Sequence, residues 1–410
     1  MVTMDLGQEG APQTFDVIDE FLLRCLRARF DEEALDEART WFSRSALAWE
    51  QVTQRTQKES ITPLIYSLLR GQTWLPQEVE ERWHQIYMHN AMRNLLLLVE
   101  LAHIIRVLAG AGVPTIVLKG GALMENVYGN VALRPMRDMD LLVHRDLAPA
   151  AMASVESLGY APSHPEEYPG MVFAYENEIA LCKADRESMP LELHWSLFDT
   201  PYYQQHLPMD WFWRTATPAL FEDAAALILG PEAQVLHLSA HLMLHHRGKG
   251  LRWLHDVAEV VHRYQSSIDW ELLLDRACRY QLALPLQKVL PLVARRWRAP
   301  IPSETLVRLD TLLPSPDERR IYRQMTTPHR SVAQRFWADL SDISGRRQQF
   351  RFLRRKLFPS TAYMRQRYGV DSHRITIFSY PYRWWLGIWS IFYRKFQTRG
   401  QVKNNDDIER

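Results

Sequence analysis

The chain has 410 residues, of which 49 are Lys or Arg and 48 are Asp or Glu, so its formal net charge is +1. Hydrophobic residues make up 47% and charged residues 24%, which excludes a disordered chain. The three cysteines (Cys25, Cys182 and Cys278) are far apart and form no CxxC pair, which excludes a disulfide framework and favours a reducing compartment. There is no basic and apolar leader, and no apolar run reaches the ~20 residues of a spanning helix. We therefore expect a cytoplasmic protein without a transmembrane segment.

Residues 1–112 predict a helical N-terminal region. Apolar residues recur there at spacings of three to four, as in Ile61, Leu64, Ile65 and Leu68. A longer amphipathic pattern covers residues 77–108, and Gly110 and Gly112 are expected to end it.

Residues 113–200 predict a small α/β core, in which apolar, strand-like segments alternate with helical ones. Strands are expected at 113–118, 139–143, 172–181 and 191–197, and helices at 122–128 and 147–158. After this core, residues 201–316 predict a helical domain, and residues 317–410 form a basic, aromatic-rich C-terminal segment.

The near-neutral total charge hides an asymmetry. Residues 317–400 contain 18 Lys or Arg and only 5 Asp or Glu, whereas residues 1–316 carry a net charge of about −11. Arginine mixed with aromatic residues suits nucleic-acid binding, or an interfacial amphipathic helix over residues 382–396. We favour a third interpretation, in which the tryptophans pack the segment onto the acidic body. These are Trp384, Trp385 and Trp389.

Two carboxylates share one face of an expected strand. Asp138 and Asp140 are two residues apart, which is the side-chain period of a strand. Like charges this close repel each other, so the pair favours a divalent cation, although a solvated strand end is the simpler alternative. In the later stretch PLELHW, Glu192 and His194 are also two residues apart and share one face of an expected strand. Glu192 supplies a third carboxylate.

A Gly-Gly pair directly follows the first expected strand. Gly120 and Gly121 let the backbone approach a ligand and place helix N-terminal amides where a phosphate can bind. Lys119, Arg134 and Arg137 supply positive charge for a polyphosphate. The two arginines are equally suited to neutralise the aspartates.

A group of histidines follows in the helical domain. His237, His241 and His245 are four residues apart and share a helical face, and His255-Asp256 forms an HD dipeptide. A metal site is one interpretation, but the spacing is short for an HD-type phosphohydrolase. A hydrogen-bonded brace between helices is the alternative that we favour.

The order of strand, Gly-Gly turn, helix, DxD strand and later acidic strand resembles the polymerase-β-like nucleotidyltransferase superfamily. Within it, the chain is similar to the bacterial family known as uncharacterised nucleotidyltransferases. The similarity covers roughly residues 90–385 and is carried by LKGGAL, YGNVALRPMRDMDLLV, PLELHW, HLMLHHRGKGLRWLHDVAEV, FPSTAYMRQRYG and YPYRWW. It implies an α+β protein, mainly helical overall, with a small mixed-sheet polymerase-β-like core flanked by helical N- and C-terminal regions.

The resemblance also implies chemistry. Asp138, Asp140 and Glu192 would hold Mg²⁺ or Mn²⁺, and a nucleoside monophosphate would pass from an NTP such as ATP to an acceptor hydroxyl with release of pyrophosphate. Glu192 stands where many members have Asp, which weakens its assignment as a base. The closer family keeps His241, Arg252, Trp253 and Asp256 together, which suits support of the site or contact with the acceptor, a role also open to His194.

The acceptor stays open among a small molecule, a peptide or protein hydroxyl, and an RNA end. A peptide is included because similar proteins occur near peptide natural-product genes. Two other functions compete with nucleotidyl transfer. A DxD pair also holds Mn²⁺ against a nucleotide-sugar in glycosyltransferases, and a vestigial site would leave a non-catalytic, antitoxin-like nucleotide-binding protein.

Overall fold

The structure is a computed structural model that describes residues 15–164, 166, 168, 170–184, 189–328, 330–368 and 380–385. The chain divides into two compact units. The first comprises the described parts of Met1–Ala161, Leu181–Leu197 and Pro208–Thr326, and the second those of Pro162–Ala180, Phe198–Leu207 and Thr327–Arg410. A mainly helical α+β fold, as expected, is confirmed.

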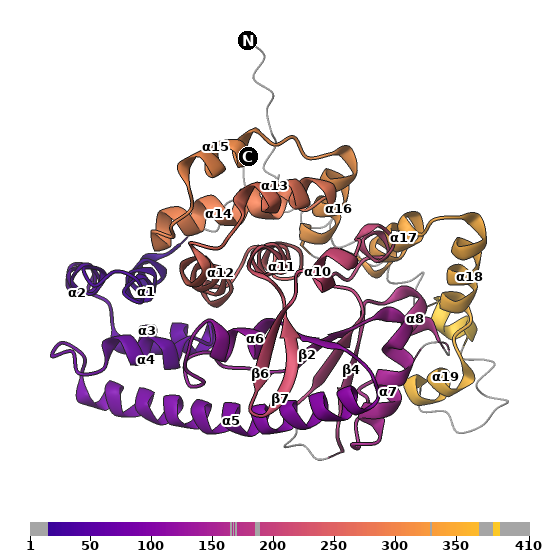
Figure 1. The fold of residues 1–410 in the computed structure, drawn as a ribbon, viewed down its shortest axis with the longest axis horizontal. Helices are drawn as coiled ribbons and strands as arrows, with labels where there is room; N and C mark the ends of the chain where they lie inside the picture. The colour runs from indigo at the N-terminus through magenta and orange to yellow at the C-terminus, as the bar shows by residue number, and fades with distance from the viewer. Residues whose placement is uncertain are drawn as a thin grey trace, which may run out of the picture. The chain divides into compact units, whose positions relative to one another are not determined.

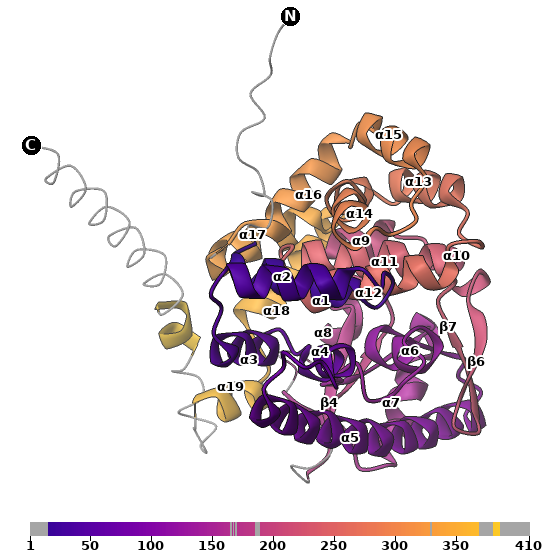
Figure 2. The ribbon, with the colours of Figure 1, turned by 90° about the vertical axis from the view of Figure 1, so that its left-hand side faces the viewer.

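The first unit begins with helices. They are α1 (Val17–Arg27), α2 (Ala34–Arg44), α3 (Trp49–Lys58), α4 (Thr62–Leu69) and the 34-residue α5 (Gln77–Gly110). Asp16 caps α1 by accepting hydrogen bonds from the backbone N–H groups of Ile18 and Asp19, both at 2.9 Å. Figure 2 shows α1 and α2 side by side, with α5 running beneath the sheet.

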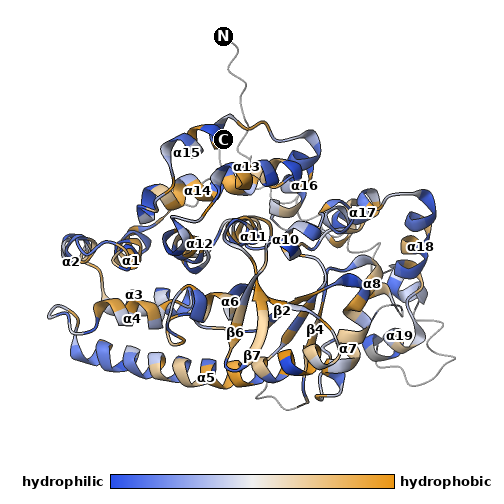
Figure 3. Ribbon diagram, in the orientation of Figure 1, coloured by the Kyte–Doolittle hydropathy of each residue, from blue (hydrophilic) through white to orange (hydrophobic). Residues whose placement is uncertain are grey.

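Seven strands form one mixed sheet, in the order β3-β4-β5-β2-β1-β7-β6. The strands are β1 (Thr115–Val117), β2 (Met139–Val143), β3 (Ala161–Pro162), β4 (Glu178–Cys182), β5 (Leu191–His194), β6 (Thr217–Phe221) and β7 (Ala224–Ile228). β2 pairs antiparallel with β1 and parallel with β5. All residues of β1 and β2 are buried, and Figure 3 colours the central strands mainly as apolar.

The remaining elements of this unit connect and cover the sheet. They are α6 (Lys119–Asn126), the 3₁₀ turn η1 (Arg145–Leu147), α7 (Ala148–Glu156), α10 (Asp210–Arg214), α11 (Pro231–Leu244), α12 (Leu251–Tyr264), α13 (Trp270–Arg279), α14 (Ala283–Trp297), α15 (Ser303–Thr311) and α16 (Pro316–Thr326). Figure 1 shows α5 along one side of the sheet and α11 and α12 on the other.

The β6–β7 hairpin corrects the expectation that the chain is only helical after residue 200. β7 pairs parallel with β1 and extends the sheet, and Glu222 in the two-residue turn has φ 52°. The sequence of β7, AAALI, is poor in β-branched residues, so its local propensity does not indicate a strand. Pairing with the buried β1 overrides that propensity.

The second unit contains α8 (Met171–Tyr175), α9 (Pro201–His206), α17 (Val332–Asp342), α18 (Arg346–Leu357) and α19 (Thr361–Tyr368). The expectation of a strand beginning at residue 172 is wrong, because the first residues of that stretch form the helix α8 and β4 begins only at Glu178. Met171 and Tyr175, four residues apart, pack in one cluster with Ile343 and Phe352. A helical turn places both side chains on the face that this cluster buries.

Part of the basic C-terminal segment is described. The indole N–H of Trp384 donates to the Leu357 carbonyl at 2.9 Å, and the Trp384 ring meets Phe358 edge-on at 5.3 Å. Trp389 and the larger part of the expected helix at 382–396 lie outside the described residues. None of the helices that the structure describes is both long and apolar enough to cross a membrane.

Glu318 makes the stability of the first unit depend on pH. Its side chain is 1% exposed and accepts a hydrogen bond from the Leu284 N–H at 2.6 Å, and burial raises the pKa of its carboxyl to about 7. Between pH ~4.5 and ~7 the folded chain holds a proton that the unfolded chain has lost, so stability falls as pH rises through this window. Glu318→Gln should remove this pH-dependent decrease in the free energy of unfolding, which amounts to up to about 3 kcal/mol.

Urea unfolding of wild type and Glu318→Gln at pH 4 and pH 8 measures this effect. The variant should be the more stable protein at pH 8, with little difference at pH 4. Glu304→Gln, at an exposed position on α15, should not change the pH profile. Parallel profiles for wild type and Glu318→Gln would contradict the prediction.

Candidate functional site

Two neighbouring strands position the central carboxylates. The parallel register of β2 and β5 pairs Asp140 with Glu192 and Leu142 with His194. Because side chains alternate along a strand, Glu192 and His194 point to the same face of the sheet as Asp140. The expected convergence of Asp140 and Glu192 is therefore present in the structure.

Asp140 is the most buried acid of the site. It is 2% exposed, and its Oδ1 lies 2.7 Å from Nζ of Lys119 and 3.0 Å from Nε2 of His194. Burial alone would raise the pKa of Asp140, but the Lys119 ammonium and the His194 hydrogen bond hold it well below its usual range. Asp140 is thus ionised in the folded protein.

Asp138 has the opposite electrostatic environment. It lies directly before β2 rather than within it, and it is half-buried. Burial, together with the charges of Asp140 and Glu192, raises the pKa of Asp138 to about 6. Glu192 has 24% of its side chain exposed, and its Oε2 is 3.6 Å from the Lys119 ammonium. A divalent cation would relieve the repulsion that raises the Asp138 pKa.

The Gly-Gly turn lies at the edge of this site, but its glycines are needed for internal packing. Lys119 begins α6 with φ 44°, a left-handed conformation that is uncommon for a side chain other than glycine. A Cβ on Gly120 would lie 2.5 Å from Nη1 of Arg134, and one on Gly121 would lie 2.7 Å from Cγ1 of Val117. Both glycines are therefore already in close contact with the protein's own atoms.

Gly120→Ala should destabilise the protein by about 1–3 kcal/mol. The contacting Arg134 atom is at the end of a long side chain, but Asp256 holds that guanidinium in place through two hydrogen bonds, so it cannot move away cheaply. Chemical denaturation measures the change. Gly110→Ala is the matched control, since its new Cβ would meet nothing within 4 Å, and equal effects of the two substitutions would refute the packing argument.

Arg134 is buried and paired with an acid, so it is not freely exposed for phosphate binding. Its Nε and Nη2 donate to the two carboxylate oxygens of Asp256 at 2.9 and 2.8 Å, and the two residues are 4% and 0% exposed. Burial would lower the pKa of Arg134, but Asp256 more than offsets this and raises it. The Tyr128 hydroxyl also donates to Asp256, at 2.7 Å. The structure thus ties α12 to the loop before β2, as a brace would.

Arg252 lies close to this pair, and none of the acids that the structure describes is its hydrogen-bond partner. Its guanidinium and that of Arg134 lie 4.4 and 5.6 Å from the Trp253 ring centre. Arg252 Nη1 is 3.5 Å from the Pro135 carbonyl, and its buried Nε has no hydrogen-bond partner among the described residues. Burial and the charges of Arg134 and Arg137 lower the pKa of Arg252 to about 10. Arg137 is exposed and donates to the Ser60 hydroxyl at 2.9 Å.

The histidines of α11 and α12 make contacts within the helical layer. Nε2 of His241 is 3.1 Å from Nε2 of His246, and both rings contact Trp253. Burial lowers the pKa of His246 to about 4 and that of His241 well below its usual range, so both are neutral. His255 pairs with Glu259 at 3.1 Å, and it accepts from the Trp297 indole at 3.0 Å. Among the described residues, neither the α11 histidines nor His255-Asp256 forms a group able to hold a metal.

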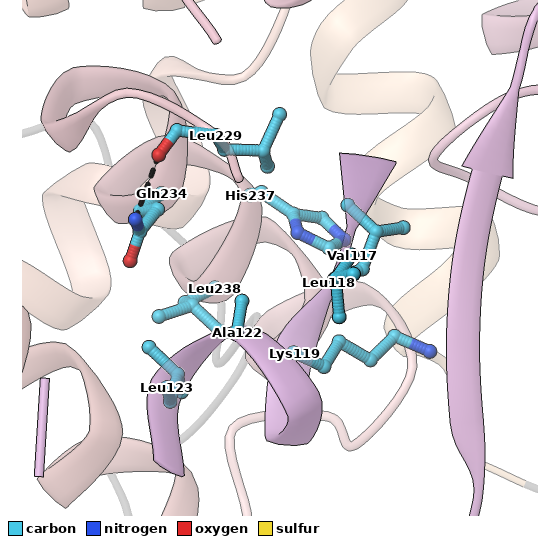
Figure 4. A pocket seen from close by; sticks show the side chains of 9 residues that line it. All are labelled: Val117, Leu118, Lys119, Ala122, Leu123, Leu229, Gln234, His237 and Leu238. Carbon is cyan, nitrogen blue, oxygen red and sulfur yellow. Dashed lines mark hydrogen bonds between the residues drawn. The ribbon is translucent and has the colours of Figure 1, made fainter. Parts of the chain in front are cut away.

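A small pocket lies between the end of β1, α6 and α11. Figure 4 shows that it is lined by Val117, Leu118, Lys119, Ala122, Leu123, Leu229, Gln234, His237 and Leu238. Gln234 donates to the Leu229 carbonyl at 2.7 Å. Burial and the Lys119 charge lower the pKa of His237 to about 3, so the lining next to Lys119 adds no further charge. His237 and Gln234 cannot be assigned to this site from the sequence, because their helix meets the end of β1 only in the tertiary structure.

The donor set fits a divalent cation. Asp140, Glu192 and His194 each offer a ligand atom, and these atoms lie within 4.8 Å of one another. The Lys119 ammonium already contacts the Asp140 and Glu192 oxygens, which shows that the group stabilises a positive charge. Carboxylate oxygens with one imidazole are suitable ligands for a divalent ion. His194, expected only as support, is therefore placed with the acids themselves.

A family model described as "Uncharacterised nucleotidyltransferase" matches residues 45–298. This is more than half of the chain and includes the acids, the Gly-Gly turn and the Arg134–Asp256 pair. The protein is thus an enzyme of the nucleotidyltransferase class. The chain belongs to the family of uncharacterised nucleotidyltransferases, although the FPSTAYMRQRYG and YPYRWW stretches fall outside the matched residues.

A solved structure, an antigenic nucleotidyltransferase-like protein from Paracoccidioides brasiliensis, is similar to this chain at 16% identity. The alignment covers 52% of this chain and 96% of that one, with a TM-score of 0.35. No curated protein matches the chain.

Proposed function

We propose that this enzyme is a bacterial member of the polymerase-β-like superfamily and works in the cytoplasm. In this proposal it transfers a nucleoside monophosphate from an NTP, such as ATP, to an acceptor hydroxyl. The observation that supports this is the convergence of Asp140 and Glu192, with Asp138 beside them, at the N-terminus of α6. Binding of Mg²⁺ or Mn²⁺ by these acids would supply positive charge to the reacting phosphates.

The reaction is a displacement at the α-phosphorus of the NTP. The acceptor oxygen forms a bond to this phosphorus, the bond to the β-phosphate oxygen breaks, and pyrophosphate leaves. We assign the acceptance of the hydroxyl proton to Glu192, because 24% of its side chain is exposed whereas Asp140 is buried. The low pKa of Asp140 keeps that residue ionised throughout.

We assign the phosphates of the NTP to Lys119, Arg137 and Arg252, with the α6 amides after Gly120. We assign phosphate binding to Arg252 rather than to Arg134. Arg134 is hydrogen-bonded to Asp256, whereas Arg252 has no acidic hydrogen-bond partner among the described residues. A guanidinium in this situation is stabilised by an anion. Arg134 then acts as a positioning residue that fixes the turn at Gly120.

The test is incubation of the full chain with each NTP or UDP-sugar, Mg²⁺ or Mn²⁺, and cell extract. Pyrophosphate release and the mass of modified species are measured, and Asp138→Asn with Asp140→Asn serves as the inactive control. We expect an added nucleotide, on a peptide, small molecule or RNA. An added hexose would instead establish the glycosyltransferase alternative, and NTP binding without any product would support a non-catalytic role.

A further inference from the structure

We infer that His194 binds the metal ion directly, and that its nitrogen gives the site a preference for Mn²⁺ over Mg²⁺. The inference rests on the proposed function only in assuming that Asp140 and Glu192 hold a divalent ion. It adds a nitrogen ligand to a site that otherwise consists of carboxylates.

The spacing of the ligand atoms supports a shared ion. Nε2 of His194 lies 3.0 Å from Oδ1 of Asp140 and 3.6 Å from Oε2 of Glu192. Two atoms that each bind one ion at ~2.1 Å are about 3.0 Å apart at an octahedral angle and about 3.4 Å apart at a tetrahedral angle. The imidazole nitrogen is therefore at ligand distance from the same position as the two carboxylates.

The backbone holds this arrangement without help from a loop. Glu192 and His194 are on β5, and Asp140 is on the directly paired β2. The His194 ring is 2% exposed, so water cannot readily replace the contacts of Nε2. A rigid, buried site of this kind presents its ligands in nearly the same positions before and after an ion binds.

Lys119 marks the place of the positive charge. Its Nζ is 2.7 Å from Oδ1 of Asp140 and 3.6 Å from Oε2 of Glu192, the same two oxygens that His194 faces. An ion bound to these oxygens would displace the ammonium, and its long flexible side chain can then reach toward phosphate. We therefore expect the metal and Lys119 to compete for the two carboxylates.

The ligand chemistry decides between the two metals. Mg²⁺ prefers an octahedral shell of oxygen atoms and gives up its water reluctantly. Imidazole suits first-row transition metals, and Mn²⁺ also accepts carboxylates. A site with two carboxylates and one histidine should therefore bind Mn²⁺ more tightly than Mg²⁺.

The test uses the full chain with MnCl₂ or MgCl₂, with and without a non-hydrolysable NTP analogue. Pulsed electron paramagnetic resonance of bound Mn²⁺ should show modulation from an imidazole ¹⁴N, and this result depends on no variant. His194→Gln should abolish the modulation and raise the Mn²⁺ dissociation constant about tenfold or more, with a smaller effect on Mg²⁺. His144→Gln is the control, because His144 is exposed and stacks on Trp213.

Two results separate failure of the inference from failure of the proposed function. If Mn²⁺ binds and Asp140→Asn removes it, but no nitrogen modulation is seen, His194 is a positioning residue and the inference is wrong. The same holds if His194→Gln weakens both metals equally. If neither metal binds the wild-type chain in a way that depends on Asp140, the metal-dependent function itself is overturned.

Discussion

Asp140→Asn should lower nucleotidyl transfer at least about a thousandfold, which corresponds to about 4 kcal/mol of transition-state stabilisation. Asp140 connects the two strands of the site: it is paired in register with Glu192, accepts a hydrogen bond from the Lys119 ammonium and lies 3.0 Å from Nε2 of His194. An amide keeps the shape of the side chain but loses the charge that binds a divalent ion. Pyrophosphate release under saturating NTP measures the loss.

The control for this substitution is Asp146→Asn. Asp146 is an exposed acid of η1, a few residues beyond β2, and its amide variant should retain wild-type activity. Circular dichroism and thermal unfolding should show that Asp140→Asn is folded. A folded Asp140→Asn enzyme with a wild-type rate would mean that the carboxylates do not carry the reaction.

Asp256→Ala should destabilise the protein by about 3–5 kcal/mol. It leaves the buried Arg134 guanidinium without its carboxylate and also removes the acceptor of the Tyr128 hydroxyl. Breaking such a pair costs more than the pair contributes, because a buried charge remains uncompensated. Urea unfolding of wild type and variant measures the difference.

Two further variants test this explanation. The double variant Arg134→Met with Asp256→Leu should recover much of the lost stability, since no buried charge is left. Asp275→Ala removes the ion pairs of an exposed carboxylate with Arg276 and Arg279 and should cost at most about 1 kcal/mol. If Asp256→Ala and Asp275→Ala were equally mild, the buried pair would not be the support that we describe.

The shared face of the carboxylates could be predicted from the sequence because it depends on short segments of the chain. Side chains alternate along a strand, so Asp140 and the Glu192–His194 pair follow from their spacing once the strands are recognised. The strand at β2 is recognisable because four of its five residues are apolar. The hairpin β6–β7 and the helix α8 could not be predicted in this way, since packing partners rather than local propensity determine them.

The partners of the arginines were decided by the tertiary structure. Arg134 and Asp256 are 122 residues apart, and no spacing rule connects them. The same holds for Gly120, whose missing Cβ leaves room for the Arg134 guanidinium rather than only for a phosphate. Arg252 becomes the better candidate for a phosphate ligand because the structure shows Arg134 hydrogen-bonded to Asp256.

The sequence by itself therefore indicated the class of enzyme through its resemblance to a known family. It also predicted that Asp140 and Glu192 lie close together, because side-chain alternation along a strand is a property of short segments. It also located the excess of positive charge in the C-terminal segment. Only the tertiary structure decided that the Lys119 ammonium lies on Asp140 and that His194 faces the two carboxylates. These contacts depend on which strands pair and which helices cover them, and long-range packing rather than local chemistry selects that arrangement.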